Sequence, residues 1–178
     1  ARAWSLQSIN PEKTTNLLRQ LAGERHYYGF LAADLVRQDY DFNHSDLIGG
    51  TSKSDVALAP EISRAKQFYE MGYYVPARRE WTAATRRFDQ PQLIDATHLA
   101  HQWGWHQQAI HTTIKANNWN DLSIRFPLAY QENMIVSAKS ATIKPEWLYA
   151  ITRQESAFAQ DAYSSAGAKG LMQLLPGP

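Results

Sequence analysis

The chain has 178 residues, with 18 Lys and Arg against 17 Asp and Glu, a formal net charge of +1 and no cysteine. The absence of cysteine excludes a disulfide framework, a thiolate zinc cluster and a cysteine nucleophile, so chemistry must come from carboxylates, hydroxyls or imidazoles. The near-neutral charge argues against nucleic-acid binding, because no broad basic field is available to release counterions. A hydrophobic content of 44% indicates a globular chain, and no apolar run approaches the roughly 18 residues of a transmembrane segment.

Two helices are predicted near the start of the chain. Asn10 and Pro11 suit an N-cap and a first helical turn, and leucines follow up to residue 21. A second helix is predicted from about Tyr27, because Tyr27, Leu31 and Leu35 lie four residues apart. The stretch 38–60 then loses periodicity and is rich in Asp, Asn, Ser and Gly. It predicts a long loop, which is uncommon inside a compact domain and therefore functional or flexible.

A helical repeat is predicted from residue 60 onward. Pro60, Pro76 and Pro91 each begin an amphipathic helix, and a fourth helix follows Gly104. The motif Gly-x4-Ala occurs at Gly72 and again at Gly104, an offset of 32 residues. A helix, a glycine turn and a helix at such a period are typical of an α-solenoid. The sequence therefore predicts an all-α fold, with a superhelical solenoid of helix pairs.

The pattern changes near residue 117. The segment N-N-W-N-D at 117–121 ends the repeat, and R-F-P at 125–127 begins a new unit. A helix is predicted to end near Ser140, and Pro145 begins the last clear helix, P-E-W-L-Y-A-I-T-R-Q-E-S-A-F.

The last helix places a carboxylate among apolar residues. Trp147, Ile151, Glu155 and Phe158 are spaced four, four and three apart, which puts Glu155 on an apolar stripe. Its helical neighbours three and four residues away are not basic, so no local salt bridge explains it. An apolar environment without a cation disfavours the charged form of a carboxyl group, which suits a general acid. The alternative is that Glu155 lies at a frayed helix end and faces water.

The segment that follows carries a family resemblance. Residues 163–176 read Y-S-S-A-G-A-K-G-L-M-Q-L-L-P, which predicts a loop able to bring backbone close to a ligand, followed by a short helix. Together with Q-E-S-A-F it closely resembles the catalytic core of the soluble lytic transglycosylases, lysozyme-like enzymes that cleave bacterial peptidoglycan. The matching elements, in order, are Glu155-Ser156, Ser164, Gly167-x2-Gly170, Gly170-Leu171-Met172-Gln173 and Pro176-Gly177. The segment R-F-P-L-A-Y at 125–130 resembles the start of that domain in the large periplasmic members.

The resemblance implies two domains and a compartment. Residues 1–126 correspond to an α-superhelical region, and residues 127–178 correspond to the N-terminal part of a lysozyme-like catalytic domain. The family's domain continues beyond the G-L-M-Q motif, so we expect a truncated cleft here, and activity of this stretch by itself stays open. The implied location is the bacterial periplasm, with a secretory signal outside this sequence.

The resemblance also implies a role for each site residue. Glu155 would be the single catalytic acid and base, and Ser164 would face the bound sugar. Met172 and Gln173 would line the wall of the cleft, and Gly170 would keep its floor open. Met172 as a core filler and Ser164 and Gln173 as turn and helix-surface residues are the alternatives.

The implied reaction cleaves the β-1,4 bond between N-acetylmuramic acid and N-acetylglucosamine during cell-wall turnover. Glu155 protonates the glycosidic oxygen and then accepts the proton of the muramoyl 6-hydroxyl, which attacks the anomeric carbon and gives a 1,6-anhydro sugar. A two-carboxylate hydrolase needs a second acid about 5 Å or about 6.5–9.5 Å away. The nearest acid in sequence, Asp161, is interpreted as a solvated turn residue, which favours the lyase reaction.

Two other functions stay open: a lysozyme-type hydrolase, and a helical-repeat module that binds a glycan or a protein without catalysis. Peptidoglycan strands are the expected partner, with cell-wall synthesis or remodelling proteins as further candidates. No cofactor is expected.

Other polar and aromatic residues are assigned structural roles. His98, His101, His106 and His111 allow a divalent metal site, but Asp95 is the only acid close in sequence, so we interpret them as surface histidines and predict no metal. The pairs Arg78-Arg79 and Arg86-Arg87 are interpreted as solvated charges. Four tryptophans fit repeat-packing positions: Trp81, Trp103, Trp105 and Trp119.

Overall fold

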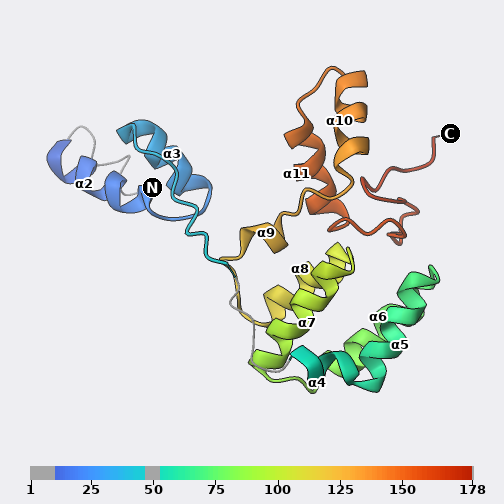
Figure 1. Cartoon of the computed structure of the whole chain (residues 1–178). Helices are drawn as coiled ribbons and strands as arrows, with labels where there is room; N and C mark the ends of the chain where they lie inside the picture. The colour runs from blue at the N-terminus through green and yellow to red at the C-terminus, as the bar shows by residue number, and fades with distance from the viewer. Residues whose placement is uncertain (1–10, 47–52, 178) are drawn as a thin grey trace. The chain divides into compact units, whose positions relative to one another are not determined.

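The computed structural model describes residues 11–46 and 53–177 (Figure 1). Regular structure in these residues is helical, with no strand beyond isolated bridges, which confirms the predicted all-α class. No helix in the described part of the chain is long and apolar enough to cross a membrane. The helices are α2 (Pro11–Ala22), α3 (Tyr27–Val36), α4 (Lys53–Leu58), α5 (Pro60–Glu70), α6 (Tyr74–Thr85), α7 (Gln90–Gln102), α8 (His106–Lys115), α9 (Leu122–Arg125), α10 (Gln131–Ser140) and α11 (Pro145–Glu155).

The chain divides into two compact units, residues 1–45 and 46–178. The first unit is the hairpin of α2 and α3, in which Ala32 and Ala33 are buried against leucines of α2. Gly29 lies where no side chain fits, because a Cβ would be 1.8 Å from the carbonyl oxygen of Glu24. His26 caps α3, since its Nδ1 accepts a hydrogen bond from the amide of Gly29 over 3.1 Å.

The predicted start of α3 is confirmed, but its predicted apolar face is not the buried one. Tyr27 is 71% exposed and Leu35 is 46% exposed. The buried face consists of small residues, which let the two helices approach closely. The predicted N-cap of α2, Asn10, lies outside the described residues.

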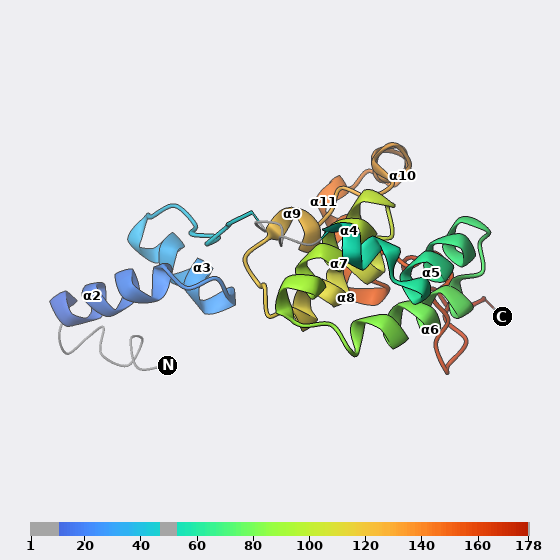
Figure 2. The ribbon, with the colours of Figure 1, turned by 60° about the horizontal axis from the view of Figure 1, so that its bottom comes forward.

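The second unit contains two successive helix hairpins, α5–α6 and α7–α8 (Figure 2). Their turns are built alike, because Gly72 and Gly104 have φ angles of +78° and +69°. The amide of the next residue donates to the carbonyl oxygen five residues back, over 2.8 Å at Tyr73 and 2.9 Å at Trp105. The predicted repeat is therefore confirmed as a repeated turn geometry.

Tryptophans fill the core of these hairpins. Trp81 is 1% exposed, and its Nε1 donates to the Oγ1 of Thr112 over 3.0 Å. Its ring meets that of Trp105 edge-on, with 5.4 Å between centroids. The predicted packing role is confirmed for Trp81, Trp103 and Trp105, but it is wrong for Trp119, which is exposed.

Two short helices were not predicted. α4 lies inside the stretch 38–60, where its Val56 joins the core of the hairpins, so the loop prediction is wrong for residues 53–58. α9 follows Asp121, whose side chain accepts a hydrogen bond from the amide of Ile124 over 3.0 Å. Residues 47–52 of the predicted loop lie outside the described residues.

The last two helices, α10 and α11, begin and end close to the predicted positions. Met134 of α10 and Leu148 of α11 pack with Phe158 and with Ile110, which comes from α8. This second core joins the repeat hairpins to the last helices and therefore fixes α11 relative to them.

Candidate active site

Helix α11 ends at Glu155 in an unusual backbone turn. Leu148 and Thr152 are the buried residues of the helix, and Glu155 is its last residue. After Ser156, Ala157 and Phe158 adopt φ angles of +50° and +68°, a region that residues with a side chain rarely occupy. Burial of the Phe158 ring, which is only 3% exposed, holds this turn in place. Backbone strain of this kind collects at functional sites.

Glu155 is exposed, and the apolar stripe expected to surround it is exposed as well. Trp147 is 65% exposed and Ile151 is 39% exposed. The expected apolar environment of Glu155 is therefore absent among the described residues, and the alternative of a helix end that faces water fits better. Phe158, the fourth member of the stripe, points into the core instead because the left-handed turn removes it from the helix.

A concavity of about 690 Å³ lies beside Glu155. Of the five predicted site residues, Glu155, Ser164 and Gln173 line it. The opposite wall comes from the repeat hairpins: Val75 and Arg78 of α6, and Gln107 and His111 of α8. The concavity is therefore shared between the last helix with its loop and the solenoid.

The loop after α11 is fixed by its own polar groups. The Oγ of Ser164 accepts a hydrogen bond from the amide of Ala168 over 3.0 Å. The carbonyl oxygen of Ala162 accepts two hydrogen bonds, from the amide of Gly170 (2.8 Å) and from the Nε2 of Gln173 (3.1 Å). The same Nε2 also donates to the carbonyl oxygen of Gly170 over 2.9 Å. Ser164 and Gln173 thus shape the loop as well as lining the concavity.

Gly170 and Met172 are not among the residues that line the concavity. Gly170 has a φ of +73°, which explains the glycine by backbone conformation. Met172 is partly buried against the second core, in agreement with its alternative role as a core filler. The predicted short helix after the loop is wrong: residues 170–173 form turns, and Lys169 bridges to Leu174.

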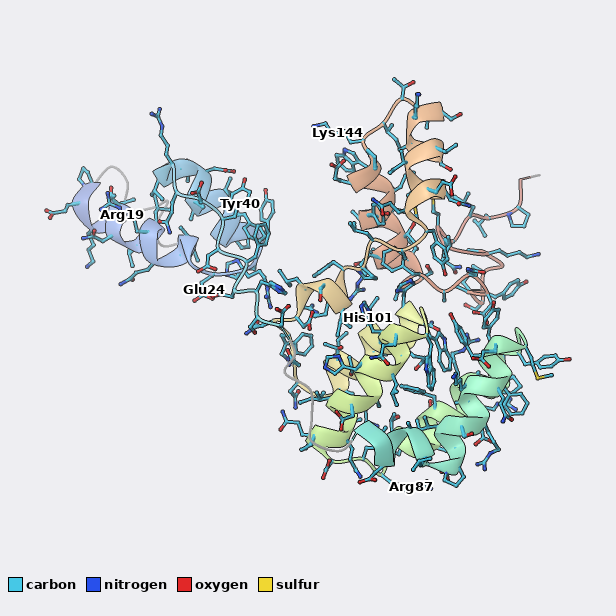
Figure 3. All side chains as sticks on the ribbon, in the orientation of Figure 1. Arg19, Glu24, Tyr40, Arg87, His101 and Lys144 are labelled. Atoms are coloured by element: carbon cyan, nitrogen blue, oxygen red, sulfur yellow. The ribbon has the colours of Figure 1, made fainter. Side chains whose placement is uncertain are left out.

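An ion pair joins the solenoid to the loop. The guanidinium of Arg78 donates to both carboxylate oxygens of Asp161, over 2.9 and 2.7 Å. The interpretation of both residues as solvated charges is therefore wrong. Arg87, just beyond the end of α6 (Figure 3), pairs with Glu61 over 2.6 Å but has a side chain that is 63% exposed, so it remains a solvated charge.

Both histidines of α8, His106 and His111, have lowered pKa values. Burial lowers the pKa of His106, and nearby His101 lowers it further. Desolvation, together with the charges of Arg153 and Arg78, lowers the pKa of His111. Among the residues that the structure describes, no three His, Asp or Glu side chains are grouped as a metal site.

The residues that the repeat hairpins contribute to the concavity were not predicted from the sequence. Arg78, Gln107 and His111 lie far from Glu155 in the chain, and no local spacing connects them. One signal in the sequence pointed toward Arg78. Asp161 is an acid next to a glycine-containing loop and has no basic residue close to it in sequence, which suggests a partner far away in the chain.

Two family models match the chain. Residues 55–122 match the soluble lytic murein transglycosylase L domain, and residues 132–177 match the transglycosylase SLT domain. Residues 1–54, 123–131 and 178 lie outside the two matches.

Curated relatives carry the same description. A putative soluble lytic murein transglycosylase of Haemophilus influenzae is 32% identical over 164 residues, which cover 92% of this chain and 28% of the relative. The soluble lytic murein transglycosylase of Escherichia coli K12 is 29% identical over 161 residues, which cover 90% and 25%. The chain thus spans between a quarter and a third of the length of these relatives.

Solved structures agree with the fold. An inactive mutant of the lytic transglycosylase Slt from Pseudomonas aeruginosa has a TM-score of 0.88 and 40% identity, covering 98% of this chain and 29% of that chain. The 70-kDa soluble lytic transglycosylase from Escherichia coli has a TM-score of 0.89 and 26% identity, covering 98% and 28%.

Proposed function

We propose that this chain, which belongs to the soluble lytic murein transglycosylase family, carries the catalytic acid of a peptidoglycan lytic transglycosylase. The proposal rests on the position of Glu155. Its carboxylate is exposed at the end of α11 and lines the same concavity as Ser164 and Gln173. An acid that must reach a bond in a polymer has to be accessible, and Glu155 meets this condition.

We propose two domains in this chain. Residues 1–126 form the solenoid, and residues 127–178 form the front of a lysozyme-like domain. The first family match ends at residue 122 and the second begins at residue 132, which supports this division. We propose the full-length protein as the active enzyme; this chain covers 28% of its curated Haemophilus relative.

The proposed mechanism uses one carboxyl group. Glu155 in its protonated form donates to the glycosidic oxygen between N-acetylmuramic acid and N-acetylglucosamine, and an oxocarbenium-like state develops at the anomeric carbon. The Glu155 carboxylate then takes the proton of the muramoyl 6-hydroxyl, whose oxygen bonds to the anomeric carbon. The product is a 1,6-anhydro sugar, no water is consumed, and Glu155 ends the cycle protonated. The enzyme is therefore a carbon–oxygen lyase.

The second acid at the concavity favours this mechanism over hydrolysis. Glu155 and Asp161 are the acids that line the described concavity. Asp161 has both carboxylate oxygens engaged by Arg78, so it is not free to act as a nucleophile or to activate water. Among the residues that the structure describes, this arrangement supports a mechanism in which Glu155 acts as the only carboxyl group.

The other predicted site residues have two kinds of proposed role, direct contact with the sugar and indirect support of the site. Ser164 and Gln173 line the concavity, and we propose that they contact a bound sugar there while holding the loop. Gly170 and Met172 act on the site indirectly, through the loop conformation and the second core. The periplasm as the compartment, and binding to cell-wall synthesis or remodelling proteins, are part of the proposal through the family alone.

The test is Glu155→Gln in the full-length protein, with Glu146→Gln as the matched control. Glu146 is an exposed acid in the first turn of the same helix. Release of muropeptides from murein sacculi should fall by about 10²- to 10⁴-fold in Glu155→Gln, since general acid catalysis is lost, and should stay unchanged in the control. Binding to sacculi should persist. Unchanged release in Glu155→Gln would refute Glu155 as the catalytic acid.

A further inference from the structure

We propose that Arg78 of the solenoid is a positioning residue for the loop that follows Glu155. Its ion pair with Asp161 holds the segment that carries Ser164 and Gln173 to the concavity. The inference rests on the proposed function only for its catalytic consequence, because the effect on the loop can be measured without any reaction.

The ion pair differs from an ordinary surface pair. It is bidentate, with N–O distances of 2.9 and 2.7 Å, and the side chains of Arg78 and Asp161 are 28% and 25% exposed. Exposed pairs contribute little to stability, whereas a planar guanidinium fork on a half-buried carboxylate fixes both distance and orientation. It also joins residues 83 apart in the chain, so it constrains tertiary structure and not a single helix.

The position of Asp161 explains how the ion pair reaches the site. Asp161 precedes Ala162, whose carbonyl oxygen receives the hydrogen bonds from Gly170 and Gln173. Three residues before Asp161, Phe158 anchors the chain in the second core. The segment between these two anchors is short, and the ion pair is the side-chain contact that fixes its far end. Releasing Asp161 therefore frees the carbonyl oxygen on which the loop is assembled.

The solenoid side of the pair is equally well placed. Arg78 lines the concavity together with Val75 of its own helix and with Gln107 and His111 of α8. Its guanidinium thus connects one wall of the concavity to the opposite wall. The distance between solenoid and loop, and with it the space available to a glycan strand, depends on this contact. A catalytic domain without the solenoid lacks it.

The first measurement is amide hydrogen exchange in the full-length protein, comparing Arg78→Ala with Arg79→Ala. Arg79 is the adjacent arginine on α6, exposed, with no ion pair among the described residues. In Arg78→Ala the amides of Ala168 and Gly170 should exchange roughly tenfold faster or more, the scale of a lost charged hydrogen bond. The amide of Trp105, in the turn between α7 and α8, should be unchanged, and Arg79→Ala should behave as wild type.

Conservative and reciprocal variants separate positioning from general stability. Arg78→Lys keeps the charge but loses the fork, so it should give intermediate exchange. Asp161→Asn should match Arg78→Ala, and the exchanged pair Arg78→Asp with Asp161→Arg should recover part of the protection. Equal acceleration of all amides in Arg78→Ala would reduce the pair to general stability and overturn the proposal.

The catalytic readout uses the full-length protein. Arg78→Ala should lower kcat/KM for muropeptide release by roughly tenfold relative to Arg79→Ala, because the released loop positions the bound substrate less well against Glu155. If Glu155→Gln retains activity, the proposed function fails while the exchange result stands. If Arg78→Ala matches Arg79→Ala in loop exchange and in kcat/KM, the positioning role itself is refuted.

Discussion

Two residues beyond Glu155, the backbone enters a conformation that is costly for any residue with a side chain. Ala157 and Phe158 have φ angles of +50° and +68°. The cost is roughly 1–2 kcal/mol for each L-residue in this region, and the burial of Phe158 offsets it. The turn directs Ala157 and the loop away from the helix axis while Glu155 stays at the helix end.

The strain at Ala157 predicts an unusual response to glycine. Ala157→Gly should change the free energy of unfolding by less than about 0.5 kcal/mol, because relief of the left-handed strain offsets the lost methyl group and the added chain entropy. Ala150→Gly, at an exposed position inside α11, should lower it by about 1 kcal/mol. Urea denaturation of both variants measures the difference. A larger loss at Ala157 than at Ala150 would show that its backbone is not strained.

At this scale the sequence predicted three residues that line one concavity, but one of its reasons was wrong. Glu155, Ser164 and Gln173 do meet at one concavity. The apolar stripe that was meant to explain Glu155 is exposed, because helical spacing defines a face but not what covers it. The engagement of Asp161 by Arg78 was invisible, since helical neighbours were the only partners that spacing could test.

At the scale of elements, the glycine turns set the geometry of the repeat. Gly72 and Gly104 occupy equivalent left-handed positions, and a Cβ at either would meet no atom within 4 Å. The requirement for glycine is therefore conformational and not steric. The equivalent position after α8 is Asn117, with a φ of +54°, and asparagine is the residue that tolerates this region best after glycine.

This comparison predicts an order of stability at each turn. Gly72→Ala and Gly104→Ala should each lower the free energy of unfolding by about 1–2 kcal/mol, whereas Gly72→Asn and Gly104→Asn should lower it by less. Thermal or urea denaturation of the four variants gives the order. Equal losses for alanine and asparagine would indicate that the left-handed conformation is not what selects glycine.

Long elements were predictable and short ones were not. α5 to α8, α10 and α11 each have ten or more residues, which is enough turns for periodicity to appear. α4 and α9 have six and four residues, too few for a pattern. The segment 170–173 has helix-forming residues, yet Gly170 and Gln173 take positive φ angles and the Oγ of Ser156 donates to the carbonyl oxygen of Leu171 over 2.7 Å. Tertiary hydrogen bonds thus override local propensity there.

At the scale of the second unit, the hairpins α5–α6 and α7–α8 and the last helices form one packed body. Ile110 of α8 packs with Leu148 and Phe158, and Arg78 of α6 holds Asp161. Residues 46–178 form one compact unit, and the predicted domain boundary between residues 126 and 127 stays a prediction. The repeat region is therefore part of the candidate site and not only a spacer before it.

The central claim is that Glu155 works as a single acid and base and consumes no water. It is tested most directly by digesting murein sacculi with the full-length protein in water enriched in oxygen-18, with a lysozyme digest in parallel as the control for label uptake. Mass spectrometry should find muropeptides with unlabelled 1,6-anhydro ends, because the muramoyl 6-hydroxyl supplies the attacking oxygen. Reducing ends that carry oxygen-18 would contradict the account and make the protein a hydrolase.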